Sequence, residues 1–181
     1  LQNEGTVIYS GGGTLTLSAT LTNNGTFEVQ PSGSVTFNTL SGAGGGSWTG
    51  PATIASGATL QFAGGTHTLQ DGFSASGVGT VSITSGTVLV NSAESAIIEN
   101  LTLDGGALRG TGTVTITDQF VWTNGDMRDA GITQTSASGA ITLAGATMDL
   151  FDGRQLINTS TTNPAIWTGG SLRGGTGSVL V

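Results

Sequence analysis

The side chains best suited to chemistry are carboxylates, and they are denser in the second half of the chain. Asp126, Asp129, Asp149 and Asp152 form two close pairs. Clustered carboxylates serve as acid and base in polysaccharide cleavage, and they also hold calcium. However, the chain has no calcium-binding nonapeptide repeat and no Lys that would act as a base. We therefore interpret these acids as solubilising turn residues, and we predict no catalytic residue, no metal site and no cofactor.

Three Trp residues share a local sequence and are candidates for sugar binding. Trp48, Trp122 and Trp167 are each followed by Thr and, within three residues, by Gly. If they occupy equivalent exposed positions, they form an aromatic ladder on which sugar rings stack. The other interpretation is a buried stack of large side chains, which the alternation of Phe120 and Trp122 favours because both then point to one face. The sequence leaves both interpretations open.

The basic residues give a second candidate ligand site. All of them are Arg, at positions Arg109, Arg128, Arg154 and Arg173. One interpretation is a short basic strip in which Arg128 and Arg173 bind an acidic polysaccharide. The other is that each Arg pairs at a turn with a neighbouring acid, such as Asp126 or Asp129, since exposed ion pairs are common.

His67 and the Thr-x-Thr pairs are weaker candidates. His67 stands alone between Thr66 and Thr68 with no obvious partner, so we interpret it as structural. Thr-x-Thr pairs also occur at Thr14 and Thr16, and they raise ice binding as a third hypothesis. These pairs are irregular along the chain, and Thr is in any case a good strand residue on a solvated surface.

Composition excludes several classes of function. The 181 residues include eleven acids and four Arg, which gives a net charge of -7. Nucleic-acid binding and binding to anionic membranes both require many cations, so neither is expected. With no Lys and no Cys, the chain cannot form a Schiff base or a disulfide, and it has no thiol nucleophile. It also has no run of 18 apolar residues, so we expect no membrane insertion.

The elements that must position these side chains are short strands. One unit recurs: a small residue, then Thr or a similar residue, then apolar, any, apolar. Examples are Gly13–Leu17, Gly25–Val29, Gly79–Ile83 and Gly112–Ile116. This alternation is typical of a strand with one buried face, and the frequent Gly disfavours helices. Turn sequences such as Asn24-Gly25 and Asp104-Gly105 separate the strands. The sequence therefore predicts an all-β protein.

A longer repeat indicates how the strands are arranged. The segment that begins at Leu1 returns at Leu21, and the segment around Trp122 returns around Trp167, about 45 residues later. These steps correspond to coils of about 18–27 residues repeated about eight times. We therefore predict a single-stranded parallel β-helix, or β-solenoid, with residues 1–181 as one domain. A β-sandwich and a β-propeller are alternatives, but the step of about 45 residues that a propeller blade requires is missing from the first half.

The repeat units resemble the β-solenoid regions of large bacterial surface and exported proteins. The resemblance is to filamentous-haemagglutinin-like adhesins and autotransporter passengers. It rests on the small-Thr-apolar units, the Leu-x-Asn-x-Gly-Thr units and the Trp-Thr-x-Gly units. The resemblance implies an extracellular or cell-surface rod that adheres or presents other domains, and it supplies no catalytic motif. No cap is evident at Leu1 or Val181. We therefore expect a segment of a longer solenoid, or end-to-end self-association, with surface glycans as possible partners. A carbohydrate-binding or carbohydrate-cleaving β-helix is the alternative.

Overall fold

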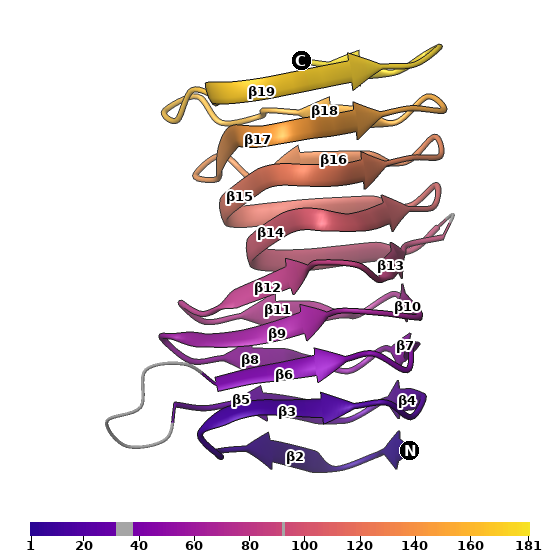
Figure 1. The fold of residues 1–181 in the computed structure, drawn as a ribbon, viewed down its shortest axis with the longest axis vertical. Coiled ribbons are helices and arrows are strands. Elements are labelled where there is room, and N and C mark those ends of the chain that lie inside the picture. The colour runs from indigo at the N-terminus through magenta and orange to yellow at the C-terminus, as the bar shows by residue number, and fades with distance from the viewer. Residues whose placement is uncertain (32–37, 92) are drawn as a thin grey trace.

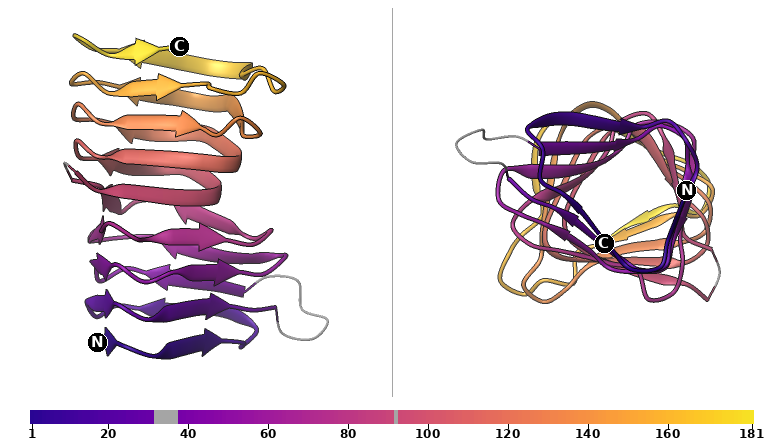
Figure 2. Two further views of the ribbon diagram at one scale, coloured as in Figure 1. Left: turned by 180° about the vertical axis from the view of Figure 1, so that it is seen from behind. Right: turned by 90° about the horizontal axis from the view of Figure 1, so that it is seen from below.

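The computed structural model describes residues 1–31, 38–91 and 93–181, and these residues form a parallel β-solenoid (Figure 1). The chain winds from one end of the stack to the other, so its termini lie at opposite ends. Seen from the N-terminal end, successive coils superpose in a common outline (Figure 2). The described residues include no helix long and apolar enough to cross a membrane.

Each coil contributes strands to three parallel faces, which the chain visits in the order face 1, face 2, face 3. Face 1 begins with β1 (Gln2–Asn3), β4 (Leu21–Asn23), β7 (Gly46–Trp48), β10 (Thr66–Leu69) and β13 (Thr87–Leu89). Face 2 contains β2 (Thr6–Tyr9), β5 (Thr26–Val29), β8 (Ala52–Ile54), β11 (Ser74–Ser76), β16 (Ile132–Thr135), β18 (Gln155–Ile157) and β20 (Val179–Leu180). Face 3 begins with β3 (Gly13–Leu17), β6 (Asn38–Gly42), β9 (Ala58–Phe62) and β12 (Thr80–Ile83).

In the second half, single strands bend around the corners and contribute to more than one face. β14 (Ser95–Arg109) and β15 (Thr113–Met127) each run from face 2 through face 3 to face 1. β17 (Ala140–Leu150) and β19 (Ile166–Gly174) each run from face 3 to face 1. Register shifts mark the bends, as between Leu103 and Ala107 in β14. The three faces are therefore joined by continuous backbone.

The register between coils confirms the predicted coil length. The shortest step pairs Ile98 with Ile116, and one of the longer steps pairs Thr22 with Ser47. Both steps lie within the predicted range. All neighbouring strands are parallel, which a solenoid of about eight coils requires. A sandwich or a propeller would instead contain antiparallel pairs.

The core lies inside the coils, because the residues of each strand alternate between the interior and the solvent. In β9, for example, Ala58, Leu60 and Phe62 are buried while Thr59 and Gln61 are partly exposed. Each coil buries only a few apolar side chains, and these pack against the equivalent side chains of the coils on either side. A coil therefore has no core of its own, and stability comes from stacking.

Candidate functional site

The structure places the three Trp residues in different environments and on two different faces. Trp48 lies on face 1, in register with Asn23 and Leu69, whereas Trp122 and Trp167 lie on face 3 on either side of Leu143. Trp122 and Trp167 therefore occupy equivalent positions, and the hypothesis of equivalence is wrong for Trp48. Trp48-Thr49-Gly50 leads into the corner between faces 1 and 2, whereas the Trp-Thr-x-Gly sequences of Trp122 and Trp167 lead into the corner between faces 3 and 1.

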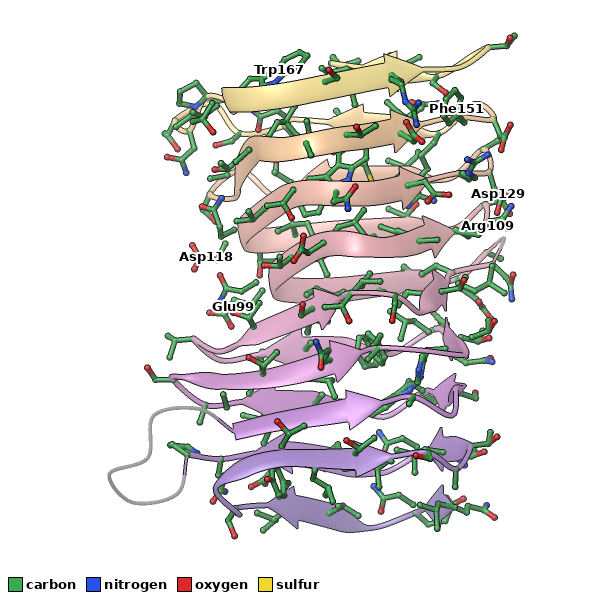
Figure 3. All side chains as sticks on the ribbon, in the orientation of Figure 1. Glu99, Arg109, Asp118, Asp129, Phe151 and Trp167 are labelled. Carbon is green, nitrogen blue, oxygen red and sulfur yellow. The ribbon has the colours of Figure 1, made fainter. Side chains whose placement is uncertain are left out.

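Burial removes two of the three Trp residues from the predicted sugar ladder. Trp48 and Trp122 are 2% and 0% exposed, while Trp167 is 52% exposed in the last coil (Figure 3). Trp48 packs against Phe27 of the preceding coil and Phe62 of its own coil, with its ring centre 5.7 Å from each of theirs. Only Trp167 is accessible to a ligand, and it lies at an end of the solenoid rather than along its side.

His67 lies in the core beside Trp48, as the structural interpretation predicted. The indole Nε1 of Trp48 donates a hydrogen bond to Nδ1 of His67 at 3.4 Å. Because Nδ1 accepts, the ring proton lies on Nε2, which donates to the carbonyl oxygens of Gly42 and Gly64 at 2.8 and 3.0 Å. Burial lowers the pKa of His67 below its ordinary value, although the two carbonyl contacts oppose this. His67 is therefore a neutral structural residue.

Arg128 and Arg173 belong to a charged strip on face 1 and its corner with face 2. We define the charged strip as Arg109, Asp126, Arg128, Asp129, Asp149, Phe151, Asp152 and Arg173. Arg109, Asp129 and Phe151 lie near one edge of the solenoid in neighbouring coils (Figure 3). The guanidinium of Arg128 lies over the Phe151 ring, 5.1 Å from its centre.

Each acid of the charged strip is close to an Arg. Asp126 accepts a hydrogen bond from Arg128 at 2.6 Å, and the two oxygens of Asp149 accept from Arg173 at 2.5 and 2.6 Å. These hydrogen bonds raise the pKa of both Arg side chains above the ordinary value. Asp129 is 3.4 Å from Arg109, and Asp152 is 4.0 Å from Arg128. The pairing interpretation holds for Arg109, Arg128 and Arg173 and is wrong for Arg154, and the strip is a series of ion pairs rather than a basic surface.

The carboxylates of the described residues do not gather into a metal-binding cluster. Within residues 1–31, 38–91 and 93–181, no three His, Asp or Glu side chains are close enough to one another to hold a metal ion. Asp126 and Asp149 are neighbours in register across adjacent coils, but each is hydrogen bonded to its own Arg. Each of these two carboxylates is therefore held by an Arg side chain.

Arg154 is a buried cation that the sequence analysis did not separate from the other Arg residues. It is fully buried and donates to the carbonyl oxygen of Gly110 at 3.0 Å and to the hydroxyl of Thr133 at 2.7 Å. Burial lowers its pKa to about 10, although the charge of Asp129 acts in the opposite direction. Arg154 follows the Asp152-Gly153 corner and directly precedes β18, whereas the other three Arg residues lie before that corner, at the end of face 1.

Both ends of the solenoid expose side chains that would be core in an interior coil. At the N-terminal end, a hollow of about 260 Å³ is lined by Leu1, Gln2, Asn3, Val7, Ile8, Tyr9, Leu15, Leu17, Leu21 and Phe27. At the C-terminal end, a hollow of about 280 Å³ is lined by Leu143, Asn158, Ala165, Ile166, Trp167, Leu180 and Val181. We name these two surfaces the N-terminal end and the C-terminal end, and most of the large apolar side chains that are exposed in the described residues belong to the first or the last coil.

Among the residues that the structure describes, the backbone at both ends is unpaired on one side. Within these residues, β1, β2 and β3 each have a strand neighbour only in the following coil, and β20 and the face-3 and face-1 parts of β19 only in the preceding one. Such strand edges are templates for further strand pairing. Comparisons with protein families, with curated proteins and with solved structures give no match for this chain. The candidate site is therefore described by its geometry alone.

Proposed function

We propose that this chain is a non-enzymatic structural or adhesive module of a bacterial extracellular or cell-surface protein. In this proposal it forms part of a rod or fibre made of stacked solenoid coils. The observation that carries the proposal is the pair of open ends. Each end combines unpaired strand edges with apolar side chains, such as Val7 and Leu15 at one end and Trp167 and Leu180 at the other.

The sides of the solenoid support the same proposal. The Asp and Arg side chains of the charged strip pair with each other, and the Thr and Ser side chains on strands such as β9 and β12 present a neutral surface. Water solvates such a surface well. The ends, in contrast, leave apolar area and backbone groups that further coils would cover. A segment of a rod requires sides that water solvates and ends on which further coils stack.

Sedimentation velocity and electron microscopy of residues 1–181 over a concentration series test this function. We expect particles that lengthen with concentration in steps of one subunit without becoming wider. Strictly monomeric particles at the highest concentrations would contradict stacking through the ends of this chain. Thickening without lengthening would indicate lateral association and would also contradict it.

Binding of a surface glycan is the second candidate function, and Trp167 is the observation that favours it. Its indole is half exposed beside Ile166 in the hollow of the C-terminal end, and its Nε1 donates to the carbonyl oxygen of Gly169 at 2.8 Å. An exposed ring held in this way is a platform for a sugar ring. Affinity electrophoresis against a panel of polysaccharides, with Trp167→Ala as the control, separates glycan binding from stacking. Retardation that the substitution abolishes would favour glycan binding.

A further inference from the structure

We propose that Asn24 is the acceptor of an N-linked sugar, which a glycosyltransferase attaches to the side of the solenoid. The side-chain amide of Asn is glycosylated in the sequence Asn-x-Ser or Asn-x-Thr, where x is not Pro. This sequence occurs three times in the chain, at Asn24-Gly25-Thr26, Asn100-Leu101-Thr102 and Asn158-Thr159-Ser160. The fold distinguishes the three, because it leaves the amide and the hydroxyl accessible together only in the first.

The chemistry of the transfer requires an accessible amide. The Asn Nδ2 forms a bond to the anomeric carbon of the sugar, and the bond from that carbon to an oxygen of the diphosphate leaving group breaks. The amide gives up one proton to a base of the transferase. The donor is a nucleoside diphosphate sugar or a lipid diphosphate sugar. Because the motif includes the hydroxyl two residues later, both the amide and the hydroxyl must project from the protein toward the transferase.

The amide of Asn158 is held inside a loop. Its Nδ2 donates to the carbonyl oxygen of Asn163 at 3.0 Å. Its Oδ1 accepts from the hydroxyl of Thr135 at 3.0 Å and from the backbone N–H of Ser160 at 3.2 Å. The hydroxyl of the same motif, on Ser160, donates to the carbonyl oxygen of Ala137 at 2.8 Å. A transferase therefore reaches this amide and this hydroxyl only after the loop opens.

Asn100 lies within β14, where the strand is paired on both sides. Leu101 is in register with Val81 of the preceding coil and with Phe120 of the following one. Asn100 is only partly exposed, and its Nδ2 donates to the carbonyl oxygen of Gly77 at 3.3 Å. Two strand pairings fix the backbone of this motif. Access of a transferase to Asn100 therefore requires local unfolding of the strand.

Asn24, in contrast, is exposed at the corner between β4 and β5. Among the described residues, its Nδ2 donates only to Oε1 of Glu4, at 2.8 Å, and the Glu4 side chain is itself exposed. Thr26 is partly exposed and projects outward, because Phe27, the next residue along β5, is buried. Asn24 and Thr26 therefore lie together on the outside of the solenoid.

The neighbouring coils leave room for a sugar at this corner. A Cβ on Gly25 would lie 2.0 Å from the carbonyl oxygen of Gly5, and a Cβ on Gly50 would lie 1.9 Å from that of Gly25. Three consecutive coils therefore stack backbone on backbone beside Asn24, with no side chain at this step of the corner. The coil of Asn24 has a strand neighbour on each side. The exposure of Asn24 is thus a property of the side of the solenoid and is independent of stacking through the ends.

In vitro glycosylation followed by peptide mapping tests the site. The folded chain is incubated with UDP-glucose and a soluble N-glycosyltransferase in one arm, and with a lipid diphosphate oligosaccharide and an oligosaccharyltransferase in the other. The two arms distinguish the two donor sources. Short synthetic peptides of the three motifs show which of them each enzyme accepts without a fold. In the folded chain, occupancy at Asn24 should be at least about ten times that at Asn100 or Asn158, because those sites must first open.

Three variants provide the controls, and circular dichroism shows that each is folded. Asn24→Gln removes the acceptor, and Thr26→Val removes the hydroxyl but keeps the β-branched shape, so both should abolish the modification. The matched variant Thr102→Val should leave it unchanged. A folded chain that stays unmodified in both arms would overturn the proposal, as would an Asn24 peptide that neither enzyme accepts. Equal occupancy at all three motifs of the folded chain would overturn selection of Asn24 by the fold.

Discussion

The coils that contain Trp122 and Trp167 have similar sequences and different surroundings. In both, Trp ends a strand segment on face 3, and its Nε1 donates to the carbonyl oxygen two residues later, Asn124 or Gly169. In both, the Arg that follows the Trp, Arg128 or Arg173, pairs with an Asp. The difference is the following coil: β17 covers Trp122, and within the described part of the chain no strand covers Trp167.

This comparison shows that burial in the solenoid is a property of the stack rather than of the coil. The same side chain is fully buried with a neighbour on each side and half exposed with one neighbour. An end coil is therefore structurally equivalent to an interior coil that has lost a partner. Substitutions of buried side chains, set beside substitutions of exposed side chains of the same type, test this conclusion.

Replacing the two Trp residues by Ala should give the largest contrast. Trp122→Ala should lower the free energy of unfolding by about 3–5 kcal/mol, because it leaves a cavity between packed coils. Trp167→Ala should change the stability of the monomer by less than about 1 kcal/mol, because half of the ring is already solvated. Urea denaturation at low protein concentration measures both values. Similar losses for the two variants would contradict the difference in burial.

The buried and exposed Arg residues should give the next contrast. Arg154→Ala should cost about 3 kcal/mol, because it removes a core side chain and leaves the Gly110 carbonyl and the Thr133 hydroxyl without their donor. Arg173→Ala should cost about 0–1 kcal/mol, since its ion pair with Asp149 is exposed. Thermal unfolding of both variants and of Arg154→Met, which preserves volume, makes the comparison. A larger loss for Arg173→Ala would show that the charged strip stabilises the fold.

Substitution of two corner Gly residues should distinguish the stability of the monomer from its end-to-end assembly. Gly25→Ala should cost about 1–3 kcal/mol, because its Cβ would overlap the Gly5 backbone and force the coils apart. Gly5→Ala should leave monomer stability unchanged within about 0.5 kcal/mol, since its Cβ meets open space. It should nevertheless weaken end-to-end assembly by at least about tenfold, equivalent to about 1.4 kcal/mol. Sedimentation of Gly5→Ala at the concentrations where wild type lengthens is the decisive measurement. Undiminished lengthening would show that Gly5 is not in the contact.

The smallest expected effect is the pH dependence that His67 confers. The folded pKa of His67 lies below its ordinary value, so the unfolded chain takes up a proton first as the pH falls. His67 should therefore leave stability unchanged above about pH 6.5 and reduce it below that pH, by at most about 1.4 kcal/mol per unit, until its folded pKa is reached. Denaturation of wild type and His67→Gln at pH 7.5 and 5.5 measures the difference. If both proteins lose the same stability, His67 is not the group responsible.

Much of the fold was predictable because the signals for strands and coils are local. The alternation in segments such as Gly13–Leu17 and Gly112–Ile116 predicted strands with one buried face. The structure confirms a strand in both segments, but only the second buries one face, because the first lies in the end coil. The return of the Leu1 segment at Leu21 predicted the coil, and the register of Thr6 with Thr26 confirms the same step. Pairing of the exposed Arg residues with nearby acids was also correct, because those partners are close in sequence or lie in adjacent coils.

The sequence by itself determined an all-β chain of repeating strands and corners with little charge. Tertiary structure alone decided which face each strand lies on, because the coils differ in length and a local corner sequence fits more than one corner. The step from Ile98 to Ile116, for example, is shorter than the step from Thr22 to Ser47. That is why Trp48 and Trp122 lie on different faces despite their similar sequences. Stacking likewise decided that Arg154 is buried and Trp167 is exposed, since burial of a side chain in a solenoid depends on the coils above and below it.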